Sequence, residues 1–397
     1  MAQSGEARSK RAVFVVLDSV GIGEMPDAAA FGDEGADTLG HIAQTVGLSM
    51  PNTRQMGLAN IRALPGMGPV DQPTAAFGRM AEASQGKDTA TGHWEFCGVI
   101  TAEGFATFPD GFPDDLIEAF CQKIGVEGVL GNKAASGTAI IKELGQEHER
   151  TGWPIVYTSA DPVFQIAAHE SVVPLETLYQ WCEAAYELVV PRGLSRVIAR
   201  PFVDQWPSYT RTYNRKDYAV PPPQATLLEK LVEGGVEVTG VGKIPSIFSH
   251  RGITHEVHTH GNDHGIEMTI EAIKSGRQGL IFTNLVDFDA LYGHRRNPQG
   301  YAQCLEDFDK QLPALVDALD PGDLLILTAD HGNDPTYKGT DHTREYVPLL
   351  VHGSDVCGGV DLGTRQTFAD IGQTLASFFG IAPLDAGTSF LDQLAGG

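Results

Sequence analysis

The sequence lacks long hydrophobic runs. No segment approaches the ~18 consecutive apolar residues that a membrane-spanning helix needs, and the first apolar stretch, residues 12–17, is interrupted by Asp18. That stretch is also too short to be the hydrophobic part of a secretion signal. We therefore expect no membrane partner and no secretion signal.

Cysteine is scarce and is not arranged in pairs. The five cysteines lie far apart, and none of them belongs to a CxxC motif. An odd number of widely separated cysteines is typical of reduced thiols, so we expect a cytoplasmic protein.

Basic residues are few as well. The chain has 28 Lys and Arg against 51 Asp and Glu, which gives a formal net charge of −23. Broad surfaces for nucleic acid or anionic membranes need an excess of Lys and Arg, so we expect neither partner. A phosphorylated substrate is compatible with this charge, because a metal ion and a few arginines reverse its sign locally. The glycine-rich segment 21–26 is not a GxGxxG dinucleotide motif, because its sixth residue is proline.

What the chain does have is an alternation of short apolar runs and helical patterns. We expect strands at 13–17, 236–241, 280–286, 324–327 and 347–351, and helices at 37–44, 226–233, 267–275 and 301–319. This alternation predicts an α/β fold with a mostly parallel sheet that is covered by helices on both faces.

The sequence pattern changes at the borders of residues 105–219. A turn-rich segment at 108–113 precedes them and three prolines at 221–223 follow them. Inside this stretch we expect helices at 114–123, 139–149 and 174–189, strands at 155–157 and 196–200, and a loop at 131–138. The sequence therefore predicts a core domain of residues 1–104 and 220–397 and an inserted α+β domain of residues 105–219. Residues 1–10 are expected to form a loose tail.

Candidate metal ligands follow three of the expected strands. Ligands bind α/β sheets outside the carboxyl ends of the strands, and carboxylates with imidazoles suit a divalent metal. Three carboxylates and three imidazoles are too many for one closed site, so the sequence predicts two neighbouring metals, an arrangement used in phosphoryl transfer. Solvated loop charges are the alternative, and the spacing does not choose between Asp287 and Asp289. The candidates are Asp18, Asp287, Asp289, His294, Asp330, His331 and His342.

A candidate nucleophile lies in the segment 84–98, SQGKDTATGHWEFCG. Small hydroxyl residues and glycine before Trp94 indicate a loop that leads into a helix, whose free N–H groups and positive dipole favour phosphate. Thr89 and Thr91 are both candidates and Ser84 is a weaker one. Simple N-capping is the alternative role for a threonine here.

The inserted domain carries the other half of a possible phosphate site. Arginine favours bidentate recognition of phosphate, although a single surface arginine is more often part of a salt bridge. Ser159 and Asp161, after an expected strand, are candidates to hold sugar hydroxyls or a phosphate. Four arginines lie within twenty positions, namely Arg196, Arg200, Arg211 and Arg215.

The densest group of histidines lies at 255–264. Its spacing is not the HExxH pattern of zinc proteases, because only two residues separate His255 from His258. We interpret it as a solvated loop between helical segments.

Eight motifs are spread over nearly the whole chain, namely DSVGIGEMPDA, GKDTATGHWE, ASGTAI, YTSADPVFQIAAHE, RVIARPF, NLVDFDALYGHRRNPQGY, TADHGNDPTYKGTDHTREYVPLL and RQTFADIG. These motifs resemble a known family, the bacterial type of phosphopentomutase in the alkaline phosphatase superfamily. The resemblance implies an alkaline-phosphatase-like core with an inserted cap domain. It also implies interconversion of ribose 1-phosphate and ribose 5-phosphate, and of the 2-deoxyribose pair.

The resemblance also assigns roles to residues. It implies that Thr89 is the nucleophile and becomes phosphorylated, and that a pentose 1,5-bisphosphate is the intermediate. It implies two metals, usually Mn²⁺, and a sugar bisphosphate as activator. One metal would be held by Asp18, Thr89, Asp330 and His331, and the other by Asp289, His294 and His342. The positions that surround the sugar phosphate would be Ser159, Asp161, Arg196, Arg211 and Lys243.

Four other functions deserve comparison. A metal-dependent phosphatase on the same core would release inorganic phosphate, and a cofactor-independent phosphoglycerate mutase would use a serine where GKDT has Thr89. A sulfatase would need the motif CxPxR or SxPxR for its modified nucleophile, and none of the five cysteines is followed by that pattern. A metal-stabilised binding protein would show no turnover. We expect a monomer, because the inserted domain must move.

Overall fold

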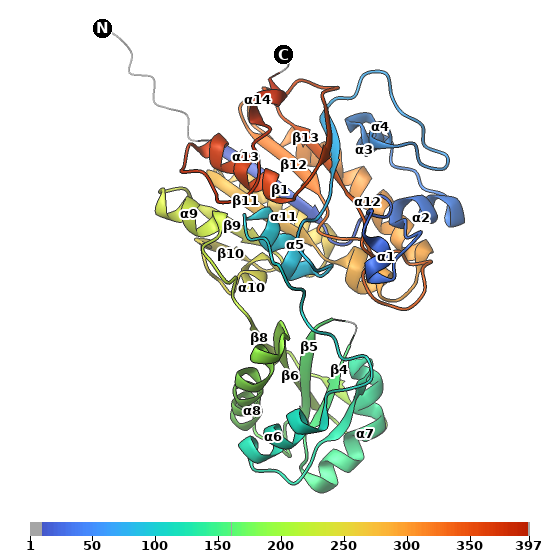
Figure 1. Cartoon of the computed structure of the whole chain (residues 1–397), viewed down its shortest axis with the longest axis vertical. Helices are drawn as coiled ribbons and strands as arrows, with labels where there is room; N and C mark the ends of the chain where they lie inside the picture. Colours follow the sequence, from blue (N-terminus) through green and yellow to red (C-terminus); the bar gives the residue numbers. More distant parts are fainter. Residues whose placement is uncertain (1–9, 160, 396–397) are drawn as a thin grey trace. The chain divides into compact units, whose positions relative to one another are not determined.

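The computed structural model describes residues 10–159 and 161–395 (Figure 1). The predicted loose tail, residues 1–10, lies outside these ranges except for Lys10. The chain divides into two compact units, which are Met1–Glu103 with Pro221–Gly397, called unit 1, and Gly104–Val220, called unit 2. The boundaries expected from the sequence differ from these by one residue at each crossing. No helix of the described residues is long and apolar enough to cross a membrane.

An eight-stranded sheet forms the centre of unit 1. Among the described strands of this sheet, only β13 runs antiparallel to its neighbours, so the predicted mostly parallel sheet is confirmed. All seven residues of β1 are buried, as expected for a strand covered on both faces. In spatial order the strands are β10 (His255–Val257), β9 (Val238–Val241), β11 (Gly279–Leu285), β1 (Arg11–Leu17), β12 (Leu324–Thr328), β13 (Val347–His352), β2 (Ala76–Met80) and β14 (Asp361–Arg365).

Helices cover both faces of this sheet. Successive residues of a strand point to opposite faces, and β11 shows both environments. Phe282 stacks on Phe14, with 4.5 Å between the ring centroids, on the face that α5 covers. The next residue, Thr283, lies 2.7 Å from the hydroxyl of Thr269 in α11 on the opposite face. One layer contains α2 (Thr38–Val46), α3 (Pro51–Met56), α11 (Asn262–Lys274) and α12 (Pro298–Asp317), and the other contains α5 (Thr89–Phe96), α9 (Leu227–Glu233), α10 (Ile244–Ile247) and α13 (Ala369–Phe379).

Short helical segments complete unit 1. They are α1 (Ala28–Phe31), α4 (Leu58–Ile61), α14 (Leu391–Leu394) and a π-helix, η2 (Phe288–Gly293), which directly follows β11. Because β11, β1 and β12 are adjacent and parallel, their carboxyl ends meet at one edge of the sheet. That edge receives the residues after each of these strands.

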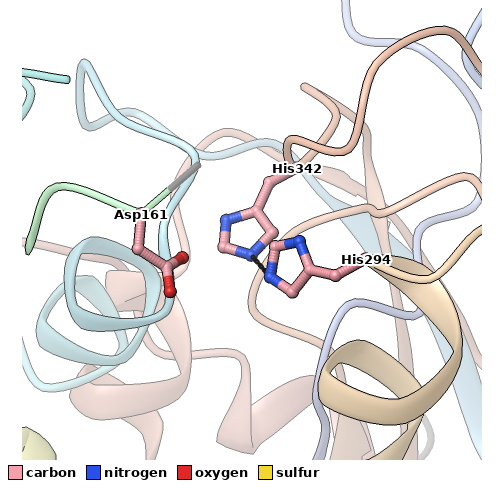
Figure 2. A group of neighbouring side chains, drawn as sticks. All are labelled: Asp161, His294 and His342. Carbon is pink, nitrogen blue, oxygen red and sulfur yellow. Dashed lines mark hydrogen bonds between the residues drawn. The ribbon is translucent and has the colours of Figure 1, made fainter. Parts of the chain in front are cut away.

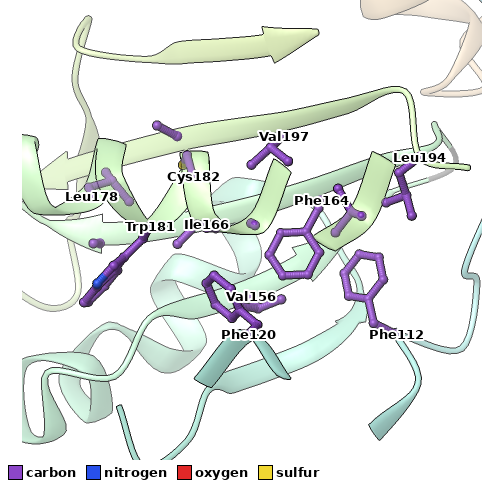
Figure 3. Close-up of a cluster of buried hydrophobic side chains, with 14 of the residues drawn as sticks. Phe112, Phe120, Val156, Phe164, Ile166, Leu178, Trp181, Cys182, Leu194 and Val197 are labelled. Carbon is purple, nitrogen blue, oxygen red and sulfur yellow. The ribbon is translucent and has the colours of Figure 1, made fainter. Parts of the chain in front are cut away.

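Unit 2 has its own sheet. Helices α6 (Asp114–Ile124) and α8 (Leu175–Val189) cover one face, and their core includes Phe120, Phe164 and Trp181 (Figure 3). Helix α7 (Gly137–Thr151) covers the other face, where Ile140 and Tyr157 are buried. The strands are β3 (Leu130–Ala134), β4 (Ile155–Thr158), β5 (Val163–His169), β6 (Arg196–Val203) and β7 (Thr210–Arg211), and β8 (Lys216–Ala219) pairs with β6; a 3-10 turn, η1 (Val190–Arg192), follows α8.

Several local predictions were wrong or incomplete. The loop expected at 131–138 contains β3, whose pairing with β4 is irregular between Gly131 and Lys133, and most of its residues are exposed. A strand with such an exposed, non-alternating sequence carries no apolar signal. The predictions also lacked β2, β5, β7, β8, β10 and β14. The histidine cluster begins on the edge strand β10 and ends in α11, so it is not one solvated loop.

Candidate active site

The first group of predicted ligands lies at the carboxyl ends of β1 and β12. Nε2 of His331 is 3.5 Å from Oδ1 of Asp18 and 3.4 Å from Oδ2 of Asp330. All three residues are buried. The hydroxyl of Thr89, at the start of α5, lies 3.3 Å from the same nitrogen. The structure therefore brings together the four residues that the resemblance assigns to one metal.

The second group depends on the π-helix η2. Its wide turn bonds the N–H of His294 to the carbonyl of Asp289, five residues earlier, at 3.1 Å. The two side chains consequently lie on one face, and His294 Nε2 is 3.1 Å from Oδ2 of Asp289. His342 Nε2 is 3.3 Å from Oδ1 of the same carboxylate. Figure 2 shows the two imidazoles facing each other, with 3.1 Å between their Nε2 atoms.

The two groups are neighbours. The rings of His331 and His342 stack with their centroids 3.9 Å apart. Asp289, His331 and His342 also have ligand atoms within 4.8 Å of one another, as do Asp18, Asp330 and His331. Two adjoining carboxylate–imidazole groups match the donor set of a two-metal site.

The protonation of the first group fits a divalent cation. Oδ1 of Asp18 is buried and has no hydrogen-bond partner among the described residues. Burial, together with the charge of Asp330, raises the pKa of Asp18 well above its usual range. Burial lowers the pKa of His331 to about 4, and its Nδ1 lies 3.1 Å from the carbonyl of Gly332. A neutral imidazole that donates from Nδ1 turns a lone pair on Nε2 toward the carboxylates, as a metal ligand does.

Three polar residues that the sequence analysis did not select hold the ligands in place. Asn284 donates from Nδ2 to Oδ2 of Asp18 at 3.0 Å, and Asn333 donates from Nδ2 to Oδ1 of Asp289 at 2.7 Å. Nδ1 of His93 lies 3.1 Å from Oδ2 of Asp330. Such partners orient metal ligands. A signal for His93 was present, because residues four apart share one face of a helix and His93 follows Thr89 by four.

The environment of Thr89 separates it from the other candidate nucleophiles. Asp88 caps α5 by accepting from the N–H of Ala90 at 3.1 Å and of Thr91 at 3.2 Å. The hydroxyl of Thr91 also donates to Asp88, at 2.5 Å, and Ser84 Oγ accepts from the N–H of Thr101. Thr89 is half-buried and faces His331. The expectation of free N–H groups at this helix start was therefore wrong for Ala90 and Thr91.

The contacts of Asp287 show that it does not belong to the group formed by Asp289, His294 and His342. Its Oδ2 accepts from the N–H of Asn262 at 2.7 Å, and its own N–H donates to Oδ1 of Asn262 at 2.9 Å. Asp287 therefore fastens the start of α11, whereas Asp289 faces the two histidines.

Buried charged residues fix the loops that carry the site. Arg344 is 1% exposed, and its Nη1 donates to Oε2 of Glu82 at 2.8 Å and to the carbonyl of Gly86 at 2.6 Å. This side chain ties the loop before Thr89 to the loop after His342. Sequence patterns did not predict this role of Arg344, because nothing in the sequence distinguishes a buried arginine from an exposed one.

The residues expected to surround the sugar phosphate belong to both units. Ser159 and Asp161 are half-buried beyond the end of β4, and Nη1 of Arg196 donates to Asp217 at 3.2 Å. Arg211 is exposed on β7. Lys243, in unit 1, is close enough to Asp18 that its charge opposes the rise in that pKa.

The histidine cluster of residues 255–264 does not form a comparable group. Nε2 of His255 is 3.6 Å from Glu237, and the rings of His260 and His264 stack with centroids 5.2 Å apart. In the part of the chain that the structure describes, no metal-type group of three or more ligands occurs there.

Comparison with known proteins agrees with this geometry. The model of the metalloenzyme superfamily matches residues 10–383. The phosphopentomutase of Anaeromyxobacter dehalogenans strain 2CP-1 is 58% identical over 387 residues, covering 97% of this chain and 99% of that protein. The phosphopentomutase of Symbiobacterium thermophilum is 56% identical over 391 residues, covering 98% and 99%.

A solved structure shares the fold. The phosphoglycerate mutase of Leishmania mexicana, studied at low cobalt concentration, superposes with a TM-score of 0.52 at 15% identity, covering 97% of this chain and 98% of that one. The α/β, alkaline-phosphatase-like fold expected from the sequence is confirmed. With more than half of the residues identical over nearly its whole length, this chain belongs to the phosphopentomutase family of the metalloenzyme superfamily.

Proposed function

We propose that this chain is a phosphopentomutase that interconverts ribose 1-phosphate and ribose 5-phosphate, and likewise the 2-deoxyribose pair. The observation that carries the proposal is the half-buried hydroxyl of Thr89, 3.3 Å from His331 and beside two adjoining carboxylate–imidazole groups. Its substrate is a small sugar phosphate.

The proposed metals are two Mn²⁺ ions. Asp18, Thr89, Asp330 and His331 would hold one, and Asp289, His294 and His342 would hold the other. When bound, the metals would neutralise charge on a transferring phosphoryl group and favour ionisation of a coordinated hydroxyl.

The chain's own residues carry the transfer. Phosphorylated Thr89 gives its phosphoryl group to the free hydroxyl of a pentose monophosphate, so the bond from phosphorus to Thr89 Oγ1 breaks as a bond to the sugar oxygen forms, and the proton of that hydroxyl passes to Thr89 Oγ1. The resulting 1,5-bisphosphate then returns its other phosphoryl group to Thr89 Oγ1, whose proton passes to the sugar oxygen that is released. A sugar bisphosphate primes Thr89 before the first cycle.

The remaining residues bind and orient. Asn284 donates to the carboxylate of Asp18, and Nδ1 of His93 lies beside the carboxylate of Asp330 and bonds to the carbonyl of Thr89 at 2.8 Å. Ser159, Asp161, Arg196, Arg211 and Lys243 are proposed to bind the sugar phosphate. Positioning and charge stabilisation account for most of the catalysis in phosphoryl transfer.

Phosphorus NMR tests the proposal. The protein is mixed with Mn²⁺, ribose 5-phosphate and a trace of a sugar bisphosphate, the protein and Mn²⁺ are removed after defined times, and the spectrum of the sugar phosphates is recorded. We expect a new anomeric-phosphate signal and little inorganic phosphate. Inorganic phosphate alone would identify a phosphatase, and no change in either signal would contradict both assignments.

The proposal includes a monomer in the cytoplasm. Sedimentation velocity at micromolar concentration tests the monomer, and a dimer at that concentration would contradict it.

A further inference from the structure

Arg296 follows the π-helix η2 in unit 1, and its side chain is half-buried. The guanidinium donates to five acceptors, of which four are backbone carbonyls and one is a side-chain amide oxygen. None of these acceptors is a carboxylate, so the planar group joins segments of the chain and does not serve to balance an acid. Nη1 donates to the carbonyl of Gly293 at 3.0 Å, to Oδ1 of Asn333 at 2.6 Å and to the carbonyl of Asp334 at 2.9 Å, while Nε and Nη2 donate to the carbonyls of Gly339 and Asp341.

The backbone of Arg296 has a conformation that usually belongs to glycine. Its φ is 51°, in the left-handed region, which is unfavourable for a residue with a Cβ. Helical segments often end on a glycine in this conformation, and here the N–H groups of Arg296 and Asn297 bond back to η2 at 3.1 Å each. Such a conformation persists where the surroundings hold it in place. The five side-chain contacts give a reason for arginine, rather than glycine, at this position.

The loop that Arg296 holds, residues 333–341, orients His294. Nδ1 of His294 lies 2.7 Å from the carbonyl of Thr340 in this loop. A neutral imidazole that donates from Nδ1 has its lone pair on Nε2, and Nε2 is the atom of His294 that lies beside Asp289. By holding the loop, Arg296 fixes the acceptor that sets the orientation of this histidine.

Arg296 also fixes the side-chain amide of Asn333. Guanidinium nitrogens only donate, so the amide atom that faces Nη1 is the oxygen. Nδ2 of Asn333 is thereby turned toward Asp289 and donates to its Oδ1 at 2.7 Å. With the amide reversed, an oxygen would face the carboxylate. Arg296 therefore acts on Asp289 through Asn333.

We propose that Arg296 is a positioning residue for the second metal group, which is formed by Asp289, His294 and His342. It acts on the carboxylate through the amide of Asn333 and on the histidines through the loop between this amide and the last of them. Its own positive charge disfavours a nearby cation, so its contribution comes from geometry and outweighs that of its charge. The inference rests on the proposed function, which supplies the second Mn²⁺.

Retention of Mn²⁺ by the full-length chain tests the inference. Arg296→Lys keeps the charge but loses the planar group that reaches several acceptors at once, and Arg296→Met removes the charge as well. The loaded chain is dialysed against a series of Mn²⁺ concentrations, and bound metal is measured by mass spectrometry. Both variants should lose one Mn²⁺ at a free concentration roughly ten- to a hundredfold higher than wild type does, as on loss of other groups that orient metal ligands. They should keep the other Mn²⁺ as wild type does.

The direction of the change separates positioning from charge. If only the charge of Arg296 mattered, Arg296→Met would hold Mn²⁺ more tightly than wild type, and Arg296→Lys would match wild type. Either result would overturn the inference. Electron paramagnetic resonance adds a signature of the pair, because two neighbouring Mn²⁺ ions couple magnetically and an isolated ion shows a resolved hyperfine pattern. At a Mn²⁺ concentration that keeps wild type fully loaded, both variants should show the pattern of the isolated ion.

A rescue experiment separates a displaced metal group from a chain that fails to fold. Excess Mn²⁺ should restore mutase turnover in Arg296→Lys, which a misfolded chain would not regain. Failure of excess Mn²⁺ to restore both metal content and turnover would overturn the inference. Arg295→Lys is the matched control, because Arg295 is the adjacent residue and is exposed. This control should retain both ions as wild type does.

Wild type itself separates this inference from the proposed function. A wild-type chain that binds only one Mn²⁺ would contradict the two-metal site and the inference together. Two bound ions and normal mutase turnover in wild type, with unaltered Mn²⁺ retention in both Arg296 variants, would reject only the role of Arg296.

Discussion

The hydroxyl of Thr89 lies 3.3 Å from Nε2 of His331, while the hydroxyl of Thr91, two residues later, is bound to Asp88. One turn of helix therefore presents one threonine to the candidate metal site and uses the other as part of its own N-cap. This difference gives the two residues separable roles that mutation can test.

Replacing Thr89 by alanine should abolish mutase activity. We expect a loss of roughly a thousandfold or more, because no other side chain takes the place of a covalent nucleophile. The assay is conversion of ribose 5-phosphate followed by phosphorus NMR. The matched variant Thr91→Ser keeps the hydroxyl that binds Asp88 and should retain most of the activity. Substantial activity in Thr89→Ala would reject the assignment.

Removing His294 should empty one of two metal positions. His294→Ala takes one imidazole from the group with Asp289 and His342, so Mn²⁺ measured by mass spectrometry after dialysis should fall from about two to about one per chain. His264→Ala, in the histidine cluster outside the site, is the control and should keep the full content. Equal metal content in wild type and His294→Ala would show that this group does not bind the ion.

Glu345 should make stability depend on pH. Burial raises the pKa of Glu345 to about 7, despite four donated hydrogen bonds, two of which come from Thr38. Between the unfolded pKa of about 4.3 and about 7 the folded chain keeps this proton and the unfolded chain loses it. The free energy of unfolding therefore decreases as pH rises through this window, by an amount on the order of 3 kcal/mol from this group.

Glu345→Gln isolates that contribution. The amide has the same shape, and its oxygen is able to accept from the two backbone N–H groups of Gly23 and Thr38. Guanidinium unfolding at pH 5 and pH 8 should show the variant gaining stability relative to wild type at the higher pH. A constant difference between the two proteins at both pH values would mean that Glu345 titrates normally.

Replacing the buried Arg344 should destabilise the protein more than replacing an exposed arginine. Arg344→Lys keeps the charge but loses the planar group that binds Glu82 and Gly86 at once, and it leaves a buried carboxylate poorly paired. We expect a loss of about 2 kcal/mol or more in the free energy of unfolding, measured with guanidinium. Arg54→Lys, at an exposed position that donates to loop carbonyls, should cost much less. Similar losses in both variants would contradict the role assigned to Arg344.

Sequence patterns predicted the parts of the fold that depend on continuous apolar runs. Strands β1, β11, β12 and β13 are fully buried along nearly their whole lengths, so their sequences are distinctive. Strand β3 has no such pattern, because most of its residues face solvent. The wrong expectation of a loop there follows from that exposure.

The candidate ligands were also visible, because they directly follow buried strands. The choice between Asp287 and Asp289 was not, because it depends on the π-helix. In an α-helix, residues five apart point in different directions, whereas the wide turn of η2 places Asp289 and His294 together. The roles of Asn284 and Arg344 depend on contacts between distant segments, which local patterns do not contain.

The strand order of unit 1 has a consequence for how the chain is made. Both neighbours of β1 begin at Gly279 or later, and β2 lies between β13 and β14. A growing chain thus releases β1 and β2 from the ribosome long before any strand that will pair with either of them. Unit 2 is continuous and ends at Val220, so it has all of its residues first, and domains fold as units during synthesis. Translation therefore completes the inserted unit before β1 has a strand to pair with. During this interval the apolar segment of β1 is exposed and is accessible to chaperones.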